Sequence, residues 1–479
     1  MPPISEEDHM PQTIRRQEPG AHPAPITLPA ILLLLALSSP AFAQPFSWTV
    51  VNVDSTSLTG AYVSLALGSD GYPRVAALAF GSDLEYLTDS AGGWSTQYPL
   101  FADPNYISLA LDANDDPGIS LFANSDGTLR YGERHAGVWS FKTVDTDPGA
   151  TGFFSSLALD AAGNPRIGYH NEGSSYSLRY AERNGGLWST QNADVAGQTG
   201  YQCQLALNSN GFPGISYYSY TAGCVKYASR NNLGVWTTEV VDATTGPPIT
   251  NGFPDHLTSI AFDSQGNPRI AYYDNVHGKL RYASKSGGMW TKVTVDSAGN
   301  VGGYVSLRLD GSDEPYISYY DIDQRDLKFS RHAQGAWSIE RVDSVGDVGR
   351  WTSLCLDASG DPYIAYGDGT NGALKLAYGT MMTASVVGDP HRLAAAGLVC
   401  GPNPTRGVLH VRFARSLDRL AVLEVVDLAG RRQTSIDVGA MAPGARSLDI
   451  STSALRAGMY FVHLKQGPTD SVARIAALR

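Results

Sequence analysis

Cysteine, cationic side chains and charge in general are scarce in this chain of 479 residues. It has four Cys, and charged residues make up only 17% of it. The 35 Lys and Arg are outnumbered by 46 Asp and Glu, which leaves a formal net charge of -11. Nucleic acids and anionic membranes are bound through basic patches, so this balance argues against both as partners. Four Cys without paired spacings exclude a dense disulfide framework and a zinc motif.

Long apolar runs are also lacking, apart from one near the N-terminus. The run ITLPAILLLLALSSPAFA covers residues 26–43, follows Arg15 and Arg16, and ends in an A-x-A-like site. A basic start, a short apolar core and small closing residues are typical of a secretory signal peptide. We expect residues 1–43 to be this signal and the mature protein to begin near Gln44, outside the cytoplasm. A membrane anchor is the alternative, but the core is short for a span, and the mature form has no other candidate span.

The motifs of common catalytic sites are missing too. H-E-x-x-H, G-x-S-x-G, the P-loop and the dinucleotide-binding fingerprint do not occur, and the ten His are scattered. Most carboxylates recur at fixed places of a repeat, which is typical of turn formers. We therefore expect no catalytic residues, no metal site and no cofactor.

Glycine and tyrosine, by contrast, are plentiful, with 51 Gly and 25 Tyr, and one phrase occurs seven times. In SLALDAAGNPRIGYH, an apolar segment is followed by a D-x-x-G-x-P turn and a second apolar segment. The copies lie about 44 to 55 residues apart, a period that indicates a repeat architecture. They begin at Ser64, Ser108, Ser156, Gln204, Ser259, Ser306 and Ser353.

Each copy divides into four β signals. The two segments of the phrase are followed by a third, such as KLRYA from Lys279, and a glycine turn leads into a fourth. Four short antiparallel strands in a repeat of this length describe one blade of a β-propeller. Each fourth strand carries one tryptophan, in order Trp94, Trp139, Trp188, Trp236, Trp290 and Trp337.

The seventh copy lacks its fourth strand, because the pattern stops at residues 373–379. The missing strand stands at the start of the mature chain, where FSWTVVNVD (residues 46–54) places Trp48 in register. Only a ring needs this permutation, since it pairs two edges that an open array would expose. The sequence predicts an all-β fold in which residues 44–380 form a seven-bladed β-propeller closed by the N-terminal strand.

The turns between third and fourth strands resemble the Asp-box of bacterial BNR-type propellers in the sialidase-like superfamily. Examples are SKSGGMW from Ser284 and DSAGGW from Asp89. The resemblance spans residues 44–379 and implies the propeller fold. The central Asp of the Asp-box is absent from these turns, so the resemblance does not imply a sialidase's activity.

A different pattern begins after a predicted linker at residues 381–396. Short alternating segments between Gly, Pro and Asp turns predict a small β-sandwich over residues 397–479. This region resembles the C-terminal sorting domain of the type IX secretion system, an Ig-like fold related to the FlgD Ig-like domain. The resemblance implies export to the cell surface or medium with the type IX secretion machinery as partner; an accessory Ig-like domain without a sorting role is the alternative. It rests on Pro402, Asn403, Pro404 and Gly407, on DLAGR at residues 427–431, and on Leu448, Asp449, Ile450, Leu455, Gly458, Tyr460 and Val462.

An aromatic residue precedes each first strand of the repeat, with histidine in the fifth copy. First strands line the central channel of a propeller, so we expect these side chains to ring its mouth, next to acidic ends of the second strands. Aromatic faces beside carboxylates suit sugar rings or cationic groups; packing between blades is the alternative. The candidate ligand-binding residues are Tyr62, Tyr106, Phe154, Tyr201, His256, Tyr304 and Trp351, with Asp274, Asp321 and Asp368.

Cys203 and Cys224 fall near the same end of the fourth copy, and we expect a disulfide between them. The chain as a whole is interpreted as a secreted or cell-surface, non-catalytic binding or adhesion protein that recognises a glycan or an extracellular protein. A propeller glycoside hydrolase or lyase is one alternative, and an envelope protein without a small ligand is another. A hydrolase would need two carboxylates about 5 to 10 Å apart at a unique site, and the sequence offers no unrepeated pair.

Overall fold

The computed structural model describes residues 46–381 and 398–477, apart from short internal gaps. The expected signal peptide (1–43) and all but the first residue of the expected linker (381–396) lie outside the described residues. The gaps are residues 56–59, 80–82, 91–92, 100–102, 148, 174, 249–255, 402–406, 414–420, 428–430, 440–446, 454, 457 and 467–468.

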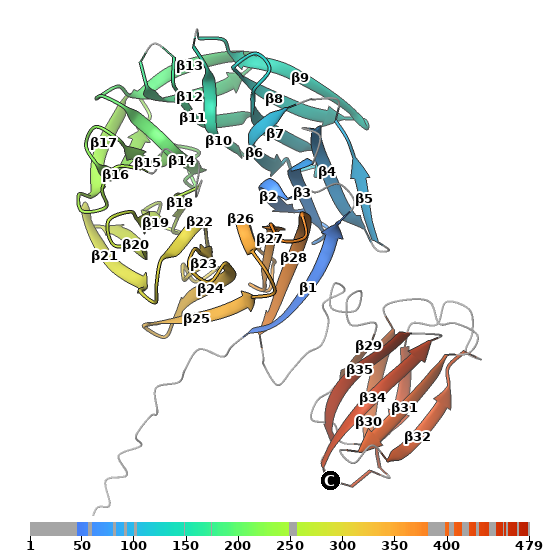
Figure 1. Ribbon diagram of the computed structural model, residues 1–479. Coiled ribbons are helices and arrows are strands. Elements are labelled where there is room, and N and C mark those ends of the chain that lie inside the picture. Colours follow the sequence, from blue (N-terminus) through green and yellow to red (C-terminus); the bar gives the residue numbers. More distant parts are fainter. Residues whose placement is uncertain are drawn as a thin grey trace, which may run out of the picture. The chain divides into compact units, whose positions relative to one another are not determined.

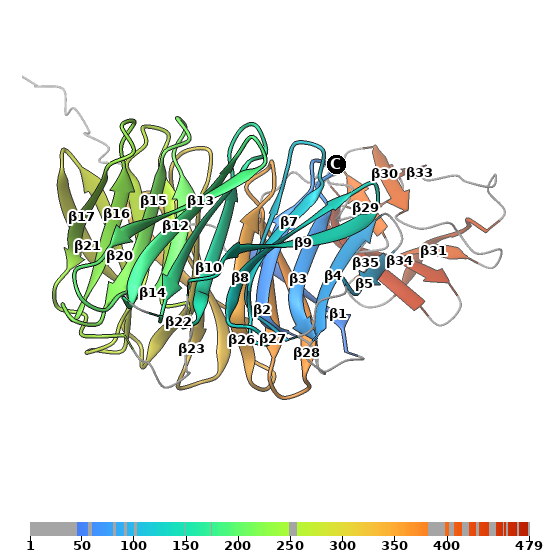
Figure 2. The ribbon, with the colours of Figure 1, turned by 90° about the horizontal axis from the view of Figure 1, so that it is seen from above.

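Residues 46–381 form seven four-stranded antiparallel sheets arranged in a ring (Figure 1). The first strand of each repeat lies innermost, and the strands run through the thickness of the ring (Figure 2). Each sheet is therefore one blade, and the predicted all-β propeller fold is confirmed.

The bounds of the strands follow the repeat closely. The blades are β2 (Ala61–Leu67), β3 (Pro73–Ala79), β4 (Asp83–Ser90) and β5 (Gly93–Gln97); β6 (Pro104–Leu111), β7 (Pro117–Ala123), β8 (Thr128–His135) and β9 (Val138–Asp145); β10 (Thr151–Leu159), β11 (Pro165–Asn171), β12 (Ser177–Asn184) and β13 (Leu187–Asp194); β14 (Thr199–Leu207), β15 (Pro213–Ser219), β16 (Cys224–Arg230) and β17 (Trp236–Asp242); β18 (Thr258–Phe262), β19 (Pro268–Asp274), β20 (Lys279–Ser286) and β21 (Met289–Asp296); β22 (Val301–Leu309), β23 (Pro315–Asp321), β24 (Asp326–Ala333) and β25 (Ala336–Asp343); β26 (Val348–Leu356), β27 (Pro362–Asp368), β28 (Ala373–Met381) and β1 (Phe46–Asp54).

Where a blade carries the D-x-x-G-x-P pattern, the turn after its first strand is built as that pattern predicts. In the third blade, Asp160 Oδ1 accepts hydrogen bonds from the backbone N–H groups of Ala162 (3.0 Å) and Asn164 (2.9 Å). Gly163 has a φ of 77°, which glycine adopts without steric cost. The aspartate and the glycine together fix the hairpin that joins the first strand to the second.

β1 closes the ring by completing the seventh blade, whose strand order is β1-β28-β27-β26. Phe46 pairs with Met381, and Trp48 pairs with Gly379. A Cβ at Gly379 would lie 3.0 Å from the Trp48 ring, so glycine leaves room for the indole. Trp48 Nε1 also donates a hydrogen bond to Glu340 Oε2 in the sixth blade (2.8 Å). The predicted pairing of the N-terminal strand with the last blade is confirmed.

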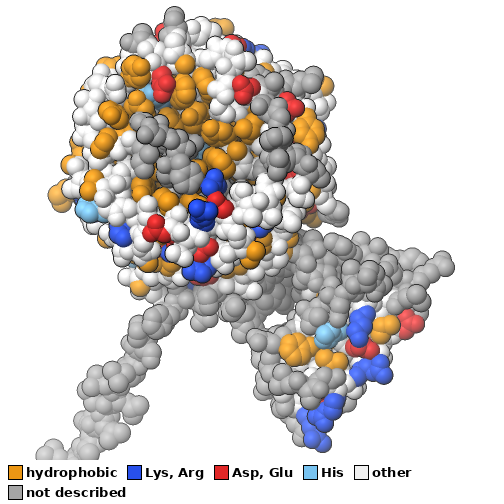
Figure 3. Space-filling model, viewed as in Figure 1, with side chains coloured by type: hydrophobic (Ala, Val, Ile, Leu, Met, Phe, Trp, Pro, Cys, Tyr) orange, Lys and Arg blue, Asp and Glu red, His pale blue; other side chains and the backbone are white. Residues whose placement is uncertain are grey.

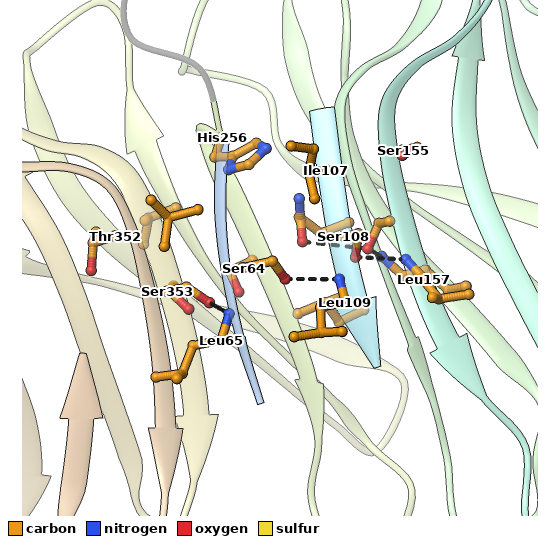
Figure 4. A pocket seen from close by; sticks show the side chains of 18 of the residues that line it. Ser64, Leu65, Ile107, Ser108, Leu109, Ser155, Leu157, His256, Thr352 and Ser353 are labelled. Carbon is orange, nitrogen blue, oxygen red and sulfur yellow. Dashed lines mark hydrogen bonds between the residues drawn. The ribbon is translucent and has the colours of Figure 1, made fainter. Parts of the chain in front are cut away.

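The serine that opens the repeated phrase joins neighbouring blades. Ser64 Oγ accepts a hydrogen bond from the backbone N–H of Leu109 in the next blade (2.9 Å), and Ser353 Oγ accepts one from Leu65 across the closing seam (3.0 Å; Figure 4). An innermost strand has only one neighbour in its own sheet, so these bonds satisfy backbone donors that the sheet leaves unpaired. The same bond is made by Ser108, Ser156, Ser259 and Ser306.

The repeated tryptophans also pack between blades. Trp48 meets Phe329 of the sixth blade edge to face at a centroid distance of 5.0 Å. The same contact recurs at 5.2–5.7 Å around the ring, a favourable geometry for aromatic pairs. The pairs are Tyr86–Trp139, Tyr131–Trp188, Tyr180–Trp236, Tyr227–Trp290 and Tyr282–Trp337.

The C-terminal region forms two antiparallel sheets that share one core. Buried side chains from both sheets, including Leu409, Leu423 and Val462, pack together. This is the β-sandwich architecture predicted for the region. One sheet consists of β29 (Leu398–Gly401), β30 (Val408–Phe413) and β33 (Ser447–Ser451), and the other of β31 (Val422–Asp427), β32 (Arg432–Asp437), β34 (Gly458–Gln466) and β35 (Thr469–Ala477).

The predicted Cys203–Cys224 disulfide is wrong, since both residues are buried free thiols. Cys203 lies on β14 and Cys224 begins β16, while β15 runs between them. Strands two positions apart are separated by roughly 10 Å, which exceeds the distance of about 7 Å that a disulfide can bridge. Cys203 Sγ instead donates a hydrogen bond to the carbonyl oxygen of Phe154 in the third blade (3.2 Å).

Candidate functional site

Each innermost strand enters the ring through one residue in the left-handed backbone region. The φ angle of these residues is 50–55°, and in most blades the residue stands where pairing with the second strand shifts register. Bulky residues rarely adopt positive φ, and a β-bulge is a feature that imposes it. This shared backbone conformation places seven side chains at the same end of the channel: Tyr62, Tyr106, Phe154, Gln202, His256, Tyr304 and Trp351.

In the fourth blade the bulge residue is Gln202, whereas the sequence predicted Tyr201 for this position. Gln202 is buried. Its Oε1 accepts a hydrogen bond from the backbone N–H of His256 (2.5 Å), and its carbonyl oxygen accepts one from the Thr258 hydroxyl (2.8 Å). Gln202 therefore makes a polar bridge to the fifth blade.

Six aromatic side chains nevertheless form a continuous series of ring contacts, which we call the aromatic collar. Hydrophobic side chains gather around the middle of one face of the ring in Figure 3, as such a collar requires. The centroid separations lie in the range of favourable aromatic pairs. They are 5.2 Å for Tyr304–Trp351, 5.9 Å for Trp351–Tyr62, 5.1 Å for Tyr62–Tyr106, 4.7 Å for Tyr106–Phe154 and 6.4 Å for Phe154–Tyr201.

The collar is only partly open to solvent. Tyr62, Tyr106 and Trp351 are half-buried, as is His256, which stands at the top of the channel in Figure 4. Tyr304 is only 1% exposed, so its role is to pack against its neighbours. Phe154 and Tyr201 are buried as well.

The three candidate aspartates accept hydrogen bonds from backbone N–H groups of the turns that they begin. Asp274, Asp321 and Asp368 are all buried. Asp368 Oδ1 accepts backbone N–H groups at 2.9 and 3.0 Å, and its Oδ2 lies 2.8 Å from Lys375 Nζ. Burial alone would raise the pKa of Asp368, but the bonds from Lys375 and the turn outweigh it and lower that pKa. Asp274 and Asp321 accept the equivalent turn bonds. The structure therefore places these carboxylates inside the fold.

Two exposed tyrosines beside the collar were missed in the sequence. Tyr176 is 42% exposed and precedes β12, and Tyr220 is 45% exposed and follows β15. The Tyr220 ring lies 6.1 Å from Tyr201, and the Tyr176 ring lies 6.5 Å from His170. We call Tyr176 and Tyr220 the tyrosine pair. Both stand in loops between second and third strands, at positions that the other copies do not fill with tyrosine; that departure was the available signal.

His170 connects the two members of the tyrosine pair through Tyr201, since its ring contacts Tyr176 and Tyr201, and Tyr201 contacts Tyr220. Its ring lies 4.3 Å from Tyr201 and is fully buried. Nδ1 lies 2.8 Å from the carbonyl oxygen of Thr199, which makes Nδ1 the protonated nitrogen. Burial lowers the pKa of His170 to about 4, so the ring is neutral at neutral pH. Glu172 adds a carboxylate beside it, and burial raises the pKa of this group.

Below the collar, the channel holds a polar cavity of about 110 Å³. It is lined by the serines of the inter-blade bonds, together with Gln204 and Arg308. This volume holds three or four waters at about 30 Å³ each, and it is well below the roughly 300–1,000 Å³ of small-molecule pockets. The cavity itself is therefore too small for a ligand of glycan size.

No helix in the described part of the chain is long and apolar enough to cross a membrane. Within the same residues, no group of three or more His, Cys, Asp or Glu is placed to hold a metal ion.

The C-terminal region matches a known family. Residues 401–477 match the family described as a secretion system C-terminal sorting domain. The sorting domain predicted at this end of the chain is thus confirmed, which implies the type IX secretion machinery as a partner and export to the cell surface or medium. No curated protein matches the chain.

Several solved structures share part of the fold at low identity. AofleA from Arthrobotrys oligospora is 13% identical, with a TM-score of 0.42, over 63% of this chain and 91% of that one. A six-bladed fucose-recognising lectin from Aleuria aurantia is 14% identical, with a TM-score of 0.42, over 61% and 97%. PorZ from Porphyromonas gingivalis, a surface component of the type-IX secretion system, is 12% identical, with a TM-score of 0.43, over 88% and 59%. Likeness at this level carries no information about a ligand.

Proposed function

We propose that the protein is an exported, non-catalytic binding protein that recognises a glycan or an extracellular protein at the face bearing the aromatic collar. The observation that carries the proposal is the tyrosine pair, because Tyr176 and Tyr220 expose aromatic faces at unrepeated positions. The repeat explains the buried part of the collar as blade packing. It offers no such reason for two solvent-exposed rings.

The chemistry of the tyrosine pair suits a glycan or a polar protein surface. Tyrosine presents a large, rigid apolar face with few rotatable bonds, and its hydroxyl adds a hydrogen bond at the tip. Glu172 supplies a carboxylate next to the same rings, and the Glu172 Oε1 atom lies 4.0 Å from His170 Nε2. Glu172 thus takes the acidic role that the sequence assigned to Asp274, Asp321 and Asp368.

Export to the surface is part of the same proposal. The match over residues 401–477 supports the final step, across the outer membrane. The proposal also includes a signal peptide at 1–43, a linker at 381–396, the Ig-like character of the C-terminal sandwich and a relationship to Asp-box propellers. These four parts rest on the sequence patterns alone.

Binding can be tested with the mature chain from residue 44 on a glycan array and a panel of surface proteins, beside chromogenic glycosides. We expect saturable binding to at least one array member and no glycoside turnover. The double variant Tyr176→Ala/Tyr220→Ala should lose that binding by at least about tenfold, since each aromatic contact contributes on the order of 1 kcal/mol. Both residues are exposed, so the melting temperature should change little.

Tyr98 provides the matched control. It is 52% exposed and follows β5 at the outer strand of the first blade. Tyr98→Ala should bind as the unaltered chain does. If the double variant and the control bind equally well, the ligand face lies elsewhere; glycoside turnover would favour the hydrolase alternative.

A further inference from the structure

Most interfaces between blades contain the same three-residue ionic contact, which we call the interface node. The aspartate that ends the outer strand of one blade accepts a hydrogen bond from a tyrosine hydroxyl and binds a Lys or Arg of the next blade. The contacts of its oxygens measure 2.5–3.2 Å. Five interfaces have a complete node: Asp145–Tyr169–Arg179, Asp194–Tyr217–Lys226, Asp242–Tyr272–Arg281, Asp296–Tyr319–Lys328 and Asp343–Tyr366–Lys375.

At the closing seam, between the seventh and first blades, the node keeps its aspartate, but its tyrosine and its cation are replaced. Asp54 ends β1 and pairs with Leu374, in the register that the other node aspartates share. On the first blade, Ala77 pairs with Glu85, at the positions where Tyr366 pairs with Lys375 in the seventh. Alanine therefore replaces the tyrosine and glutamate replaces the cation.

Glu85 is the least compensated charge among the described residues of the ring. Its side chain is 0% exposed, and neither carboxylate oxygen has a hydrogen-bond partner in the described structure. Burial, together with the nearby charge of Asp54, raises the pKa of Glu85 to about 8. A buried carboxylate without a partner is costly, and Ala77 has no hydroxyl to donate where the other nodes have a tyrosine.

We propose that Asp54 and Glu85 bind a divalent cation of the Ca²⁺ class at the position that Lys or Arg fills in the other interfaces. Carboxylate oxygens are the ligands that Ca²⁺ prefers, and it completes its shell with waters and backbone carbonyls. The ion would link β1 to β4, and so would hold the first strand of the propeller to the first blade where the ring closes. A proton on Glu85 is the competing occupant.

The test compares thermal melting of the mature chain in EDTA and in millimolar CaCl₂. Ligand that binds only the folded state raises the melting temperature, and we expect a saturable rise of about 5 °C. Equilibrium dialysis with ⁴⁵Ca²⁺ should show one ion per chain. Glu85→Lys restores the cation of the other nodes, so its melting temperature should not respond to Ca²⁺.

Two further variants keep the outcome unambiguous. Glu85→Gln keeps the shape and removes the charge, so it should bind no Ca²⁺ even if Glu85→Lys fails to fold. Asp116→Lys makes the equivalent change of charge at a partly exposed turn and should respond to Ca²⁺ fully. An unaltered chain whose melting temperature ignores both EDTA and Ca²⁺ would overturn the proposal in favour of a protonated Glu85. A Ca²⁺ response that persists in Glu85→Gln would place the ion elsewhere and overturn it too.

Discussion

Phe46→Ala is expected to weaken the closure of the ring, because Phe46 anchors β1 to the neighbouring sixth blade. The side chain is 4% exposed. Its ring lies 5.6 Å from Phe329 and 6.4 Å from Tyr316, and the Arg331 guanidinium lies 4.8 Å above it. Truncating a buried phenylalanine costs about 3–5 kcal/mol. Since Phe46 begins its strand and its surroundings can relax, we expect about 3 kcal/mol.

That loss should lower the melting temperature by about 4 °C, because an unfolding entropy of about 2.1 cal/mol/K per residue gives roughly 1.4 °C per kcal/mol for a domain of about 340 residues. The assay is thermal unfolding followed by circular dichroism and tryptophan fluorescence. Thr49→Ala is the control, since Thr49 is exposed on the same strand. If the two variants melt together, β1 does not hold the ring closed, and the role assigned to the N-terminal strand fails.

Three further outcomes are expected. Ser306→Ala should lower stability by about 1–3 kcal/mol in urea unfolding, since the Leu354 N–H loses its acceptor; equal midpoints would show that water replaces the hydroxyl. In EDTA, the folded state favours protonated Glu85, whose pKa is raised to about 8 by burial and by Asp54. Stability should therefore fall as pH rises from about 4.5 to 8, less steeply in Glu85→Gln, and identical slopes would contradict this. Truncation after residue 394 should leave a folded propeller in the periplasm of a host with this secretion system, as cell fractionation would show; equal export of both forms would remove the sorting role.

Much of the fold could be predicted because each blade repeats the same local chemistry. The Asp160 turn with Gly163 is specified within five residues, so it can be read from one copy. Trp48 could be assigned to the last blade because its pattern matches the six other tryptophans, and the structure pairs it with Gly379 as expected. Local signals of this kind need no knowledge of neighbouring blades.

The candidate site was harder to predict because it depends on contacts between blades. The one-residue difference between Tyr201 and Gln202 arises at a β-bulge, which breaks the alternation on which strand reading relies. The burial of Tyr304 depends on Trp351 from the next blade. The disulfide prediction failed for a related reason, since the distance between two strands depends on what lies between them.

The node aspartates show the same limit and how repeats can overcome it. In the sequence, the aspartate that ends most fourth strands reads as a turn former, and Asp194 Oδ1 does accept a turn N–H. Its Oδ2 serves a different purpose, because it binds Tyr217 and Lys226 of the next blade. Once that role is known, the departures from it become informative. Glu85 stands where every other blade has Lys or Arg, at the seam where the two ends of the propeller meet, and five intact nodes show what its surroundings lack. Residues that repeat from blade to blade thus report on the fold. A residue that departs from the repeat and still stays buried, as Glu85 does, marks a place where a ligand is to be sought.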